Sequence, residues 1–367
     1  MTYNWQKPDW PNFKFDFKEI ENDLFLFTEA AGQIVGLSKA IPEKVQTESL
    51  LQFMVSEALK TSEIENEYYS REDIYSSIRN NLGLNTTKLK VKDLRAEGIG
   101  KLVIEGRRTY KEDISVSILL DWHSTLFPSR TDIRTGSWRK HKDPMQIVSG
   151  VLGRETIHFE APPSSDIPQL MKAFIKWFND TSPDGNQMIR HAPIRASIAH
   201  LYFESIHPFE DGNGRIGRLL ADKALSQSLG YPALLSLSTE LESNKKEYYN
   251  ALKIAQRNNE ITPWIKYFIG VLINAQTNTE VIIQFTLKKA KIFDEFKEQL
   301  NNRQTKCIQR MFEAGPRGFI GGMSAKKYMS LSKTSKATAT RDLQVLENLG
   351  ILESYGGGRS THYQLKI

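Results

Sequence analysis

Cysteine is nearly absent from this chain, because Cys307 is the only one in 367 residues. A single cysteine excludes an internal disulfide and a cysteine metal cluster, and its place in an apolar pattern predicts a core residue. Long apolar runs are also lacking, since none approaches the roughly 20 residues that span a bilayer. The first residues lack a basic segment followed by an apolar one. We therefore expect a cytoplasmic protein with no membrane partner.

Acidic residues are scarce at the C-terminal end. Residues 303–367 contain eleven Lys/Arg against four Asp/Glu, whereas the net charge of the whole chain is +6. The basic character therefore belongs to this end, which indicates an anionic partner for it, nucleic acid above all. The overall composition is that of an ordinary globular protein, and the length suits two or three domains.

Aromatic residues and proline dominate the first residues, with Trp5, Pro8, Trp10 and Pro11 among them. Because proline disfavours helix, we expect residues 1 to about 45 to form a non-helical arm. Its aromatic side chains are expected to pack on the body of the protein.

One short polar run differs from the rest of the chain. It covers residues 207–218 and reads His-Pro-Phe-Glu-Asp-Gly-Asn-Gly-Arg-Ile-Gly-Arg. Its glycines can turn successive amide groups toward one point, and an anion bound there also meets the positive end of a following helix. Arg215 and Arg218 lie three residues apart, so on a helix that begins near Asn213 they project from one face and bind phosphate oxygens. The backbone positions of this phosphate cradle are Gly212, Asn213 and Gly214.

Two further residues of the run supply chemistry. The carboxylate of Asp211 can hold a magnesium ion. The imidazole of His207 can accept a proton from a hydroxyl group when its pKa lies near neutrality. The alternative is a helix N-terminus that carries glycines and charges without a catalytic role.

The run resembles the signature of the Fic family, His-x-Phe-x-(Asp/Glu)-Gly-Asn-Gly-Arg-x-x-Arg, with every fixed position filled. The resemblance implies a mainly α-helical Fic core with a β-hairpin flap, and transfer of AMP from ATP to a Ser, Thr or Tyr hydroxyl of a protein. It implies that His207 takes the hydroxyl proton, that Asp211 holds Mg²⁺, and that Arg218 binds the γ-phosphate. The residues that would stabilise the developing negative charge are Gly212, Asn213, Gly214 and Arg215.

A second motif precedes this core and reads Thr-Ser-Glu-Ile-Glu-Asn at residues 61–66. It resembles the Fic inhibitory motif, (Ser/Thr)-x-x-x-Glu-(Gly/Asn), and by that resemblance Glu65 is the inhibitory glutamate. A carboxylate paired with Arg218 would occupy the guanidinium that must receive the γ-phosphate. The acids at positions 63, 65 and 67 also suit a solvated acidic turn, which is the alternative interpretation.

Two short β-branched stretches, at residues 147–148 and 156–159, are separated by glycines and predict a β-hairpin. The hairpin resembles the flap over the Fic active site. A free strand edge there would add the target peptide as an extra strand, with Val148 facing the target. A plain surface hairpin is the alternative.

The segment 244–252 resembles the adenine-pocket helix of the Fic family. Tyr248 and Tyr249 would lie near the base, since an aromatic face can stack on adenine. Gln256 takes the place of an asparagine in the family pattern, so base preference stays open. Tyrosines at this spacing also suit a hydrophobic core.

From residue 305 the pattern changes to three short helices, at 305–314, 324–331 and 336–349, followed by two strands. This order is similar to a winged helix-turn-helix, whose basic residues would meet DNA phosphates. A module for dimerisation or domain packing is an equal alternative.

We therefore expect three segments: an arm and helical region with the inhibitory motif (1–100), a Fic catalytic domain (101–300), and a winged helix-turn-helix domain (301–367). The expected function is that of a protein adenylyltransferase autoinhibited by Glu65, which acts on a target protein or on itself. One alternative is other Fic chemistry, namely UMP or phosphocholine transfer or removal of AMP. The other is a nucleotide-sensing DNA-binding regulator. Homodimer formation is left open.

Overall fold

The computed structural model describes residues 2–85, 87–149, 156–316 and 318–366. The chain divides into two compact units: unit 1 comprises Met1–Gly36 and Phe53–Thr279, and unit 2 comprises Leu37–Gln52 and Glu280–Ile367. Within the described residues each unit is mainly helical and contains one two-stranded antiparallel sheet. The predicted fold class, mainly α-helical with a β-hairpin, is confirmed. The predicted three-segment division stays a prediction.

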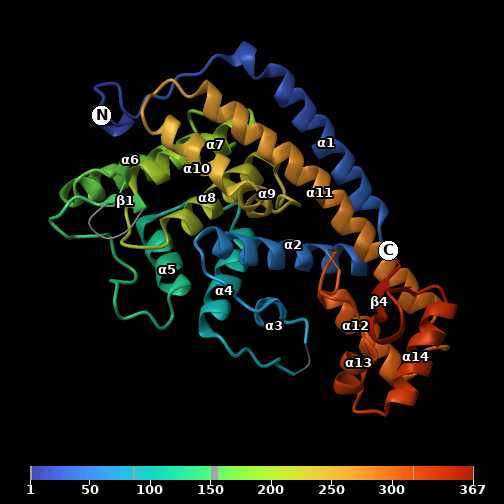
Figure 1. The fold of residues 1–367 in the computed structure, drawn as a ribbon. Helices are drawn as coiled ribbons and strands as arrows, with labels where there is room; N and C mark the ends of the chain where they lie inside the picture. Colours follow the sequence, from blue (N-terminus) through green and yellow to red (C-terminus); the bar gives the residue numbers. More distant parts are fainter. Residues whose placement is uncertain (1, 86, 150–155, 317, 367) are drawn as a thin grey trace. The chain divides into compact units, whose positions relative to one another are not determined.

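The elements follow one another along the chain as labelled in Figure 1. Those up to α11 are α1 (Glu21–Ala40), α2 (Glu43–Ile64), α3 (Arg71–Asn81), α4 (Leu94–Arg108), α5 (Val116–Leu126), β1 (Gln146–Ser149), β2 (Thr156–Glu160), α6 (Ile167–Asp180), α7 (Ala192–Ile206), α8 (Asn213–Leu229), α9 (Leu237–Ser243), α10 (Lys245–Ala255) and α11 (Thr262–Glu295). The remaining elements are α12 (Asn302–Glu313), α13 (Ala325–Ser332), α14 (Lys336–Asn348), β3 (Leu352–Tyr355) and β4 (His362–Leu365). None of the described helices has an apolar stretch that could cross a membrane.

Helices α7 and α8 pack against each other in unit 1 (Figure 1). Every side chain of α7 is buried, as expected of a helix that is enclosed on all sides. Helices α4 and α9 pack against α8, and α6 packs against α7. Pro193 lies in the first turn of α7, where its missing N–H costs no helical hydrogen bond. The connection between α7 and α8 is thus held by buried elements on both sides.

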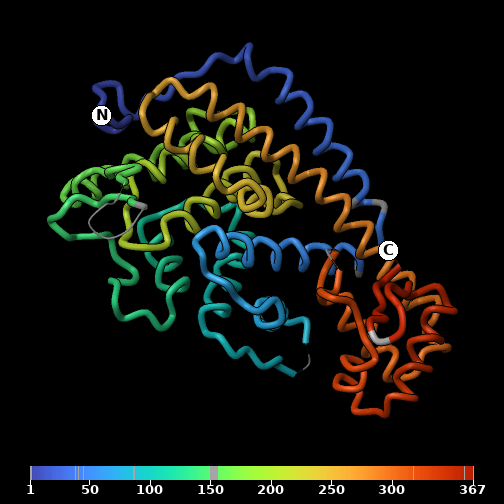
Figure 2. Tube along the Cα trace, in the orientation of Figure 1, coloured from blue at the N-terminus to red at the C-terminus, as the bar shows by residue number. Residues whose placement is uncertain are grey.

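Left-handed backbone conformations define this connection. His207 ends α7 with φ 52° and ψ 60°, and Gly212 precedes α8 with φ 82°. Glycine adopts such angles readily, whereas a residue with a side chain does so only where its surroundings hold it. The start of α8 at Asn213 agrees with the predicted helix start. In Figure 2 the C-terminal end of α2, in blue, lies beside α8.

The predicted β-hairpin is present as β1 and β2, which pair antiparallel with a register shift between Ile147 and Val148. The N-terminal residues pack on it. Tyr3 and Trp5 contact its apolar face, and the Trp5 indole donates a 2.8 Å hydrogen bond to the carbonyl of Glu160. The predicted packing of the aromatic arm is therefore confirmed for these residues.

The expectation that residues 1 to about 45 lack helix is wrong, because α1 begins at Glu21. The prolines that motivated it, Pro8 and Pro11, lie well before this helix, and residues 21–40 contain no proline. Proline prevents helix only at its own position and just before it. Its influence therefore does not reach α1.

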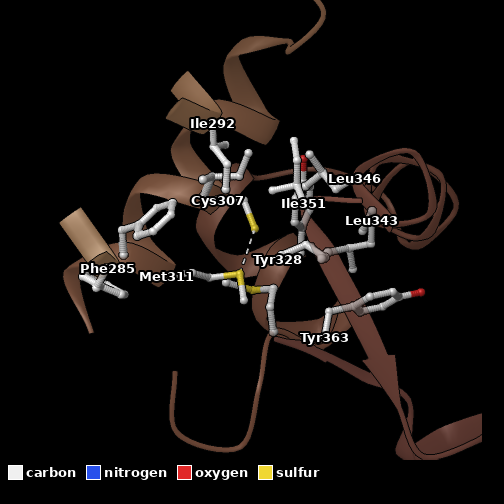
Figure 3. Packing of buried hydrophobic residues seen from close by; sticks show 14 residues of the cluster. Phe285, Ile292, Cys307, Met311, Tyr328, Leu343, Leu346, Ile351 and Tyr363 are labelled. Carbon is white, nitrogen blue, oxygen red and sulfur yellow. Dashed lines mark hydrogen bonds between the residues drawn. The ribbon is translucent and has the colours of Figure 1, made fainter. Parts of the chain in front are cut away.

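Unit 2 has a core of its own, shown in Figure 3. Helices α12, α13 and α14 and the strands β3 and β4 follow the order predicted for the C-terminal segment. Cys307 is fully buried in this core, where its thiol lies 4.0 Å from the sulfur of Met311. Burial raises the pKa of the Cys307 thiol to about 12, so the thiol stays protonated. The core position predicted for the cysteine is confirmed.

A buried carboxylate connects the helices α12, α13 and α14 of unit 2. Asp342 on α14 is 4 % exposed and accepts hydrogen bonds from Arg303 (2.8 Å), at the start of α12, and from the hydroxyl of Tyr328 (2.9 Å) on α13. Loss of this carboxylate would leave a buried phenol without an acceptor, which costs more than the hydrogen bond contributes.

We predict that Asp342→Ala lowers the local unfolding free energy of α12–α14 by about 2 kcal/mol. Hydrogen exchange of the backbone amides in these helices measures it, since all six tryptophans lie in unit 1 and do not report on unit 2. Gln344→Ala, at an exposed position of the same helix, is the control and should change the free energy by less than about 0.5 kcal/mol. Equal protection in both variants would contradict the prediction.

Candidate active site

His207 lies at the end of α7, and a buried arginine holds its backbone. The guanidinium of Arg139 donates hydrogen bonds to the carbonyls of His207 (2.8 Å) and Pro162 (2.6 Å), and the Arg139 backbone N–H donates to the carbonyl of Pro208 (2.9 Å). Arg139 is 1 % exposed. These bonds account for the left-handed conformation of His207. The role of Arg139 could not be predicted, because it acts on carbonyl groups that a sequence pattern does not display.

The imidazole of His207 is neutral at physiological pH. Burial lowers its pKa to about 4, and the Arg139 guanidinium acts in the same direction. Nδ1 lies 3.7 Å from a carboxylate oxygen of Glu204, a group whose pKa burial raises to about 8. Glu204 is therefore mostly protonated at neutral pH. A neutral imidazole can accept a proton, but the pKa near neutrality that was expected for this role differs from the value of about 4 in the folded chain.

Asp211 lies four residues after His207, and its side chain is 37 % exposed. One oxygen accepts from the Gly212 backbone N–H at 2.6 Å and lies 3.3 Å from Arg215; the other accepts from Arg130 at 2.7 Å. The described residues hold no cluster of three or more His, Cys, Asp or Glu that suits a metal. Magnesium in nucleotide sites commonly takes one or two carboxylates and completes its shell with phosphate oxygens and water. The carboxylate of Asp211, which is partly accessible to solvent, fits that kind of site.

His123 on α5 supports the same loop. Its Nδ1 accepts from the Gly136 backbone N–H at 2.9 Å, so Nε2 carries the hydrogen and donates to the Asp211 carbonyl at 3.2 Å. The ring stacks on Phe209, with centroids 4.1 Å apart. Burial lowers the pKa of His123 to about 4, which keeps this tautomer neutral. His123 thus positions the Asp211 backbone without entering the chemistry.

The predicted phosphate cradle lies at the start of α8. A Cβ on Gly212 would lie 2.8 Å from the Phe127 ring, so the close packing and the positive φ both require glycine. The side chain of Asn213 is already used, because it accepts from the Phe209 N–H and donates to the Phe209 carbonyl, both at 2.9 Å. Asn213 therefore fixes the loop with its side chain and offers an anion only its backbone N–H.

Arg218 is 1 % exposed. Its partners are Thr61, in the last turn of α2, and Glu65, which directly follows this helix. Nε donates to the Thr61 hydroxyl at 2.8 Å, and Nη2 donates to the Thr61 carbonyl at 2.9 Å and to the Glu65 carboxylate at 2.8 Å. Nη1 has no partner among the described residues. The pairing of Glu65 with Arg218 that the inhibitory motif implies is thus present as a contact.

The Glu65 carboxylate lies directly against the cradle. A Cβ on Gly214 would lie 2.2 Å from Oε1 of Glu65 and 3.0 Å from Nη1 of Arg218. Glu65 therefore occupies space that only glycine leaves free on the first turn of α8. A negatively charged group at this place is favoured by the helix dipole and the free N–H groups.

Glu67 is a site residue that the sequence interpretation missed. Its carboxylate accepts from Nη1 of Arg215 at 2.6 Å, and the Arg215 guanidinium packs over the Phe127 ring. The sequence placed Glu67 among the acids of a solvated turn. Its distance of 148 residues from Arg215 in the chain left no pattern from which the pair could be inferred.

The three residues predicted to bind the base differ in exposure. Tyr248 and Gln256 are 1 % and 3 % exposed. Tyr248 shares a 2.9 Å hydrogen bond with His200, and Gln256 donates to the carbonyl of Glu204. Tyr249 is 40 % exposed and donates to the carbonyl of Ile64 at 3.3 Å. Of the three, only Tyr249 is exposed, and the base-binding roles of all three stay predictions.

Val148 lies on β1, next to the register shift, and its side chain is 48 % exposed. An exposed apolar residue on a two-stranded sheet is compatible with the predicted docking of a target strand. Its role in docking stays a prediction.

Two family models match the chain. Residues 113–225 match the Fic/DOC family, and residues 3–84 match a domain of unknown function, DUF4172. The first match includes His207 and Arg218, and the second includes Glu65 and Glu67.

Curated relatives are named protein adenylyltransferase Fic. The protein from Drosophila melanogaster is 28 % identical over 157 residues, or 43 % of this chain and 28 % of the relative. The protein from Drosophila grimshawi is 33 % identical over 130 residues, or 35 % of this chain and 24 % of the relative. The chain thus spans only about a quarter of the length of these relatives.

Solved structures share the fold. A Fic family protein from Desulfovibrio desulfuricans G20 superposes with a TM-score of 0.53 at 20 % identity, and the match covers 94 % of this chain and 95 % of that one. Fic-1 from C. elegans superposes with a TM-score of 0.52 at 18 % identity, over 73 % of this chain and 74 % of that one. The mainly helical core with its hairpin is therefore the fold seen in Fic proteins.

We predict that Gly214→Ala displaces the Glu65 carboxylate and lowers the unfolding free energy of unit 1 by about 1–3 kcal/mol, because the added Cβ overlaps Oε1. Urea unfolding followed by tryptophan fluorescence measures it. Gly270→Ala is the control, since nothing lies within 4 Å of a Cβ at this position in α11; it should leave stability unchanged or raise it by up to about 1 kcal/mol. Equal effects of the two substitutions would contradict the close approach of Glu65.

We predict that His207 makes the stability of unit 1 depend on pH between about 6.5 and 4. In this range the unfolded chain binds a proton at His207 and the folded chain does not, so stability falls as the pH falls. Relative to His207→Gln, the parent should lose up to about 1.4 kcal/mol per pH unit in this window. Urea unfolding at several pH values measures the difference. Parallel pH curves would show that the His207 pKa is not lowered.

Proposed function

The chain carries a domain of the Fic/DOC family, and we propose that it transfers AMP from ATP to a Ser, Thr or Tyr hydroxyl of a protein and is autoinhibited by Glu65. The observation that carries the proposal is the juxtaposition at the α7–α8 connection. There the neutral imidazole of His207 precedes a helix N-terminus whose two arginines, Arg215 and Arg218, are buried and paired with acids.

His207 acts as the general base in this proposal. Its neutral imidazole takes the proton of the target hydroxyl as the oxygen attacks the α-phosphorus of ATP, and pyrophosphate leaves. Arg139 contributes by holding the His207 backbone, so the ring does not need to be ordered at the moment of reaction. Glu204, which is mostly protonated near neutral pH, does not compete with His207 for the role of base.

The start of α8 stabilises the negative charge. In this proposal the backbone N–H groups of Asn213 and Gly214 and the guanidinium of Arg215 bind the transferred phosphoryl group and the diphosphate. The Gly212 N–H, which donates to Asp211 here, would exchange that partner for a phosphate oxygen. Arg218 binds the γ-phosphate. Positioning and electrostatic stabilisation account for most of the catalysis of phosphoryl-type transfer, because the protein forms no covalent bond in it.

Asp211 would hold Mg²⁺ in the proposed complex, and the ion would neutralise charge on the phosphates. The Asp211 carboxylate here accepts hydrogen bonds from Arg130 and Arg215. His123 holds the Asp211 backbone in place through its hydrogen bond to the Asp211 carbonyl.

Glu65 restrains the reaction because it occupies the Arg218 guanidinium. A carboxylate at 2.8 Å and a γ-phosphate cannot both take the same Nη2 donor. With Arg218 occupied, ATP binds without its γ-phosphate anchor and its α-phosphorus is misplaced relative to His207.

Tyr249 and the hairpin are the proposed contacts for the nucleotide base and for the target protein. Tyr249 offers an exposed ring for stacking on adenine, which does not select adenine over uracil. UMP transfer, phosphocholine transfer and removal of AMP therefore remain alternatives that use the same cradle. Val148 on the hairpin is the proposed contact for the target backbone, and the chain itself is one such target.

A DNA-binding regulator is the second candidate, and the basic C-terminal residues favour it. Lys333 lies in the turn between α13 and α14 in left-handed conformation, and α14 begins with a serine cap at Ser335. A helix that follows such a turn is the recognition element of helix-turn-helix proteins. Specific DNA binding by His207→Ala, combined with no transfer by any variant, would support this candidate.

We predict that Glu65→Gly raises AMP transfer, including self-modification, by about tenfold or more, because a charge-assisted hydrogen bond to Arg218 is removed. Incubation with α-labelled ATP and Mg²⁺ measures the transfer. His207→Ala in the Glu65→Gly background should lower the rate by a factor of about 10²–10⁴. If Glu65→Gly is no more active than the parent with any of several labelled nucleotides, the inhibitory role of Glu65 is wrong.

A further inference from the structure

We propose that Glu67 is a second inhibitory carboxylate, which holds Arg215 as Glu65 holds Arg218. This inference rests on the proposed function, in which both arginines bind phosphate groups of the nucleotide. It assigns to Glu67 a part in the control of nucleotide binding. The two acids would occupy arginines that bind different phosphates of the nucleotide.

The contact between Glu67 and Arg215 is short and largely enclosed. Nη1 and Oε2 lie 2.6 Å apart, and the side chains are 2 % and 24 % exposed. The other acidic partner of Arg215, Asp211, lies farther away at 3.3 Å. Nε of Arg215 is buried with no partner among the described residues. Glu67 is therefore the closest charge partner of a guanidinium that has little access to water.

One left-handed residue brings both acids to α8. Asn66 has φ 60°, and the backbone N–H groups of Glu65 and Glu67 both donate to the carbonyl of Ser62, at 2.9 and 3.0 Å. The turn closes tightly on the end of α2, and the acids on the two sides of Asn66 reach two arginines that lie three residues apart on one face of α8. The turn is thus matched to the spacing of the arginines.

Contacts outside α8 hold the turn in place. The amide oxygen of Asn66 accepts from Lys245 on α10 at 2.8 Å. The Tyr69 hydroxyl donates to the same Glu67 oxygen that binds Arg215, and the Tyr69 ring packs against the Arg95 guanidinium at 5.2 Å. The Glu67 carboxylate is therefore held by a partner on each side, which favours a fixed position over a mobile surface acid.

The two carboxylates obstruct different parts of a nucleotide. Glu65 occupies the arginine assigned to the γ-phosphate, whereas Glu67 occupies the arginine nearer to the cradle, which serves the phosphates that ADP also has. Removal of Glu65 alone leaves Arg215 engaged. ADP therefore distinguishes the two acids, because it lacks the group that Arg218 binds.

Nucleotide binding to four variants tests the inference: Glu65→Gln, Glu67→Gln, the double variant and the control Glu63→Gln, each in a His207→Ala background that prevents turnover. Glu63 is the matched control because it lies on the same segment but pairs with Lys60. Calorimetric titration with ADP and with ATP, both with Mg²⁺, gives the dissociation constants. Urea unfolding checks that each variant is folded.

We predict that Glu67→Gln tightens ADP binding about tenfold, as expected for loss of one partly exposed charge-assisted hydrogen bond. Glu65→Gln should tighten ATP binding by a similar factor with little effect on ADP, and Glu63→Gln should change neither. The double variant should bind ATP more tightly than either single variant. If Glu67→Gln does not fold, Glu67→Asp, which keeps the charge and shortens the reach, should change ADP binding in the same direction.

Two results would distinguish a wrong role for Glu67 from a wrong proposed function. If Glu65→Gln tightens ATP binding but no substitution at Glu67 changes ADP binding, the role of Glu67 is wrong and the proposed function stands. If no variant, including the double variant, binds either nucleotide, the proposed function itself fails.

Discussion

A guanidinium that is buried almost completely must keep an acceptor of opposite charge, and this constraint governs the site. Arg218 is 1 % exposed, and its bonds go to Thr61 and Glu65. Removal of such a partner without a substitute leaves a buried charge uncompensated, which costs several kcal/mol. In the proposed complex a phosphate group would supply the negative charge that Glu65 supplies to Arg218 here. Because Nη2 of Arg218 is buried and already donates to Glu65, a phosphate that takes this donor must displace the carboxylate.

Side chains form hydrogen bonds to the backbone of the connection between α7 and α8 and add to the packing that holds it. Arg139 binds the carbonyl of His207, Asn213 closes on Phe209, and His123 binds the carbonyl of Asp211. Three side chains from different parts of the chain thus satisfy carbonyl groups that a tight loop would otherwise leave unpaired. A loop fixed in this way loses little entropy when a ligand binds.

The parts of the site that a local pattern encodes were predictable from the sequence. The segment 207–218 carries the proposed base, the proposed cradle and both arginines within twelve residues, so their approximate arrangement follows from helix geometry alone. The contact of Glu65 with Arg218 spans 153 residues and was anticipated only through a family resemblance. Glu67 and Arg139 were missed because their partners are set by tertiary structure. The same holds for Tyr248, which lies in the core although its neighbour Tyr249 is exposed.

Glu65 and Arg218 belong to one compact unit of one chain, so opening of the pair is a unimolecular equilibrium. Its position does not depend on the concentration of the protein. A free anion that competes for Arg218 must displace the Glu65 carboxylate. The effective concentration of this carboxylate at Arg218 is in the millimolar range or higher, as for other groups joined by a chain. A small anion with a single contact therefore competes poorly, and dilution leaves the pair closed. A ligand that binds at several points along the first turn of α8 has the same advantage as Glu65, because its groups are joined to one another. The proposed nucleotide, with its linked phosphates, is a ligand of this kind.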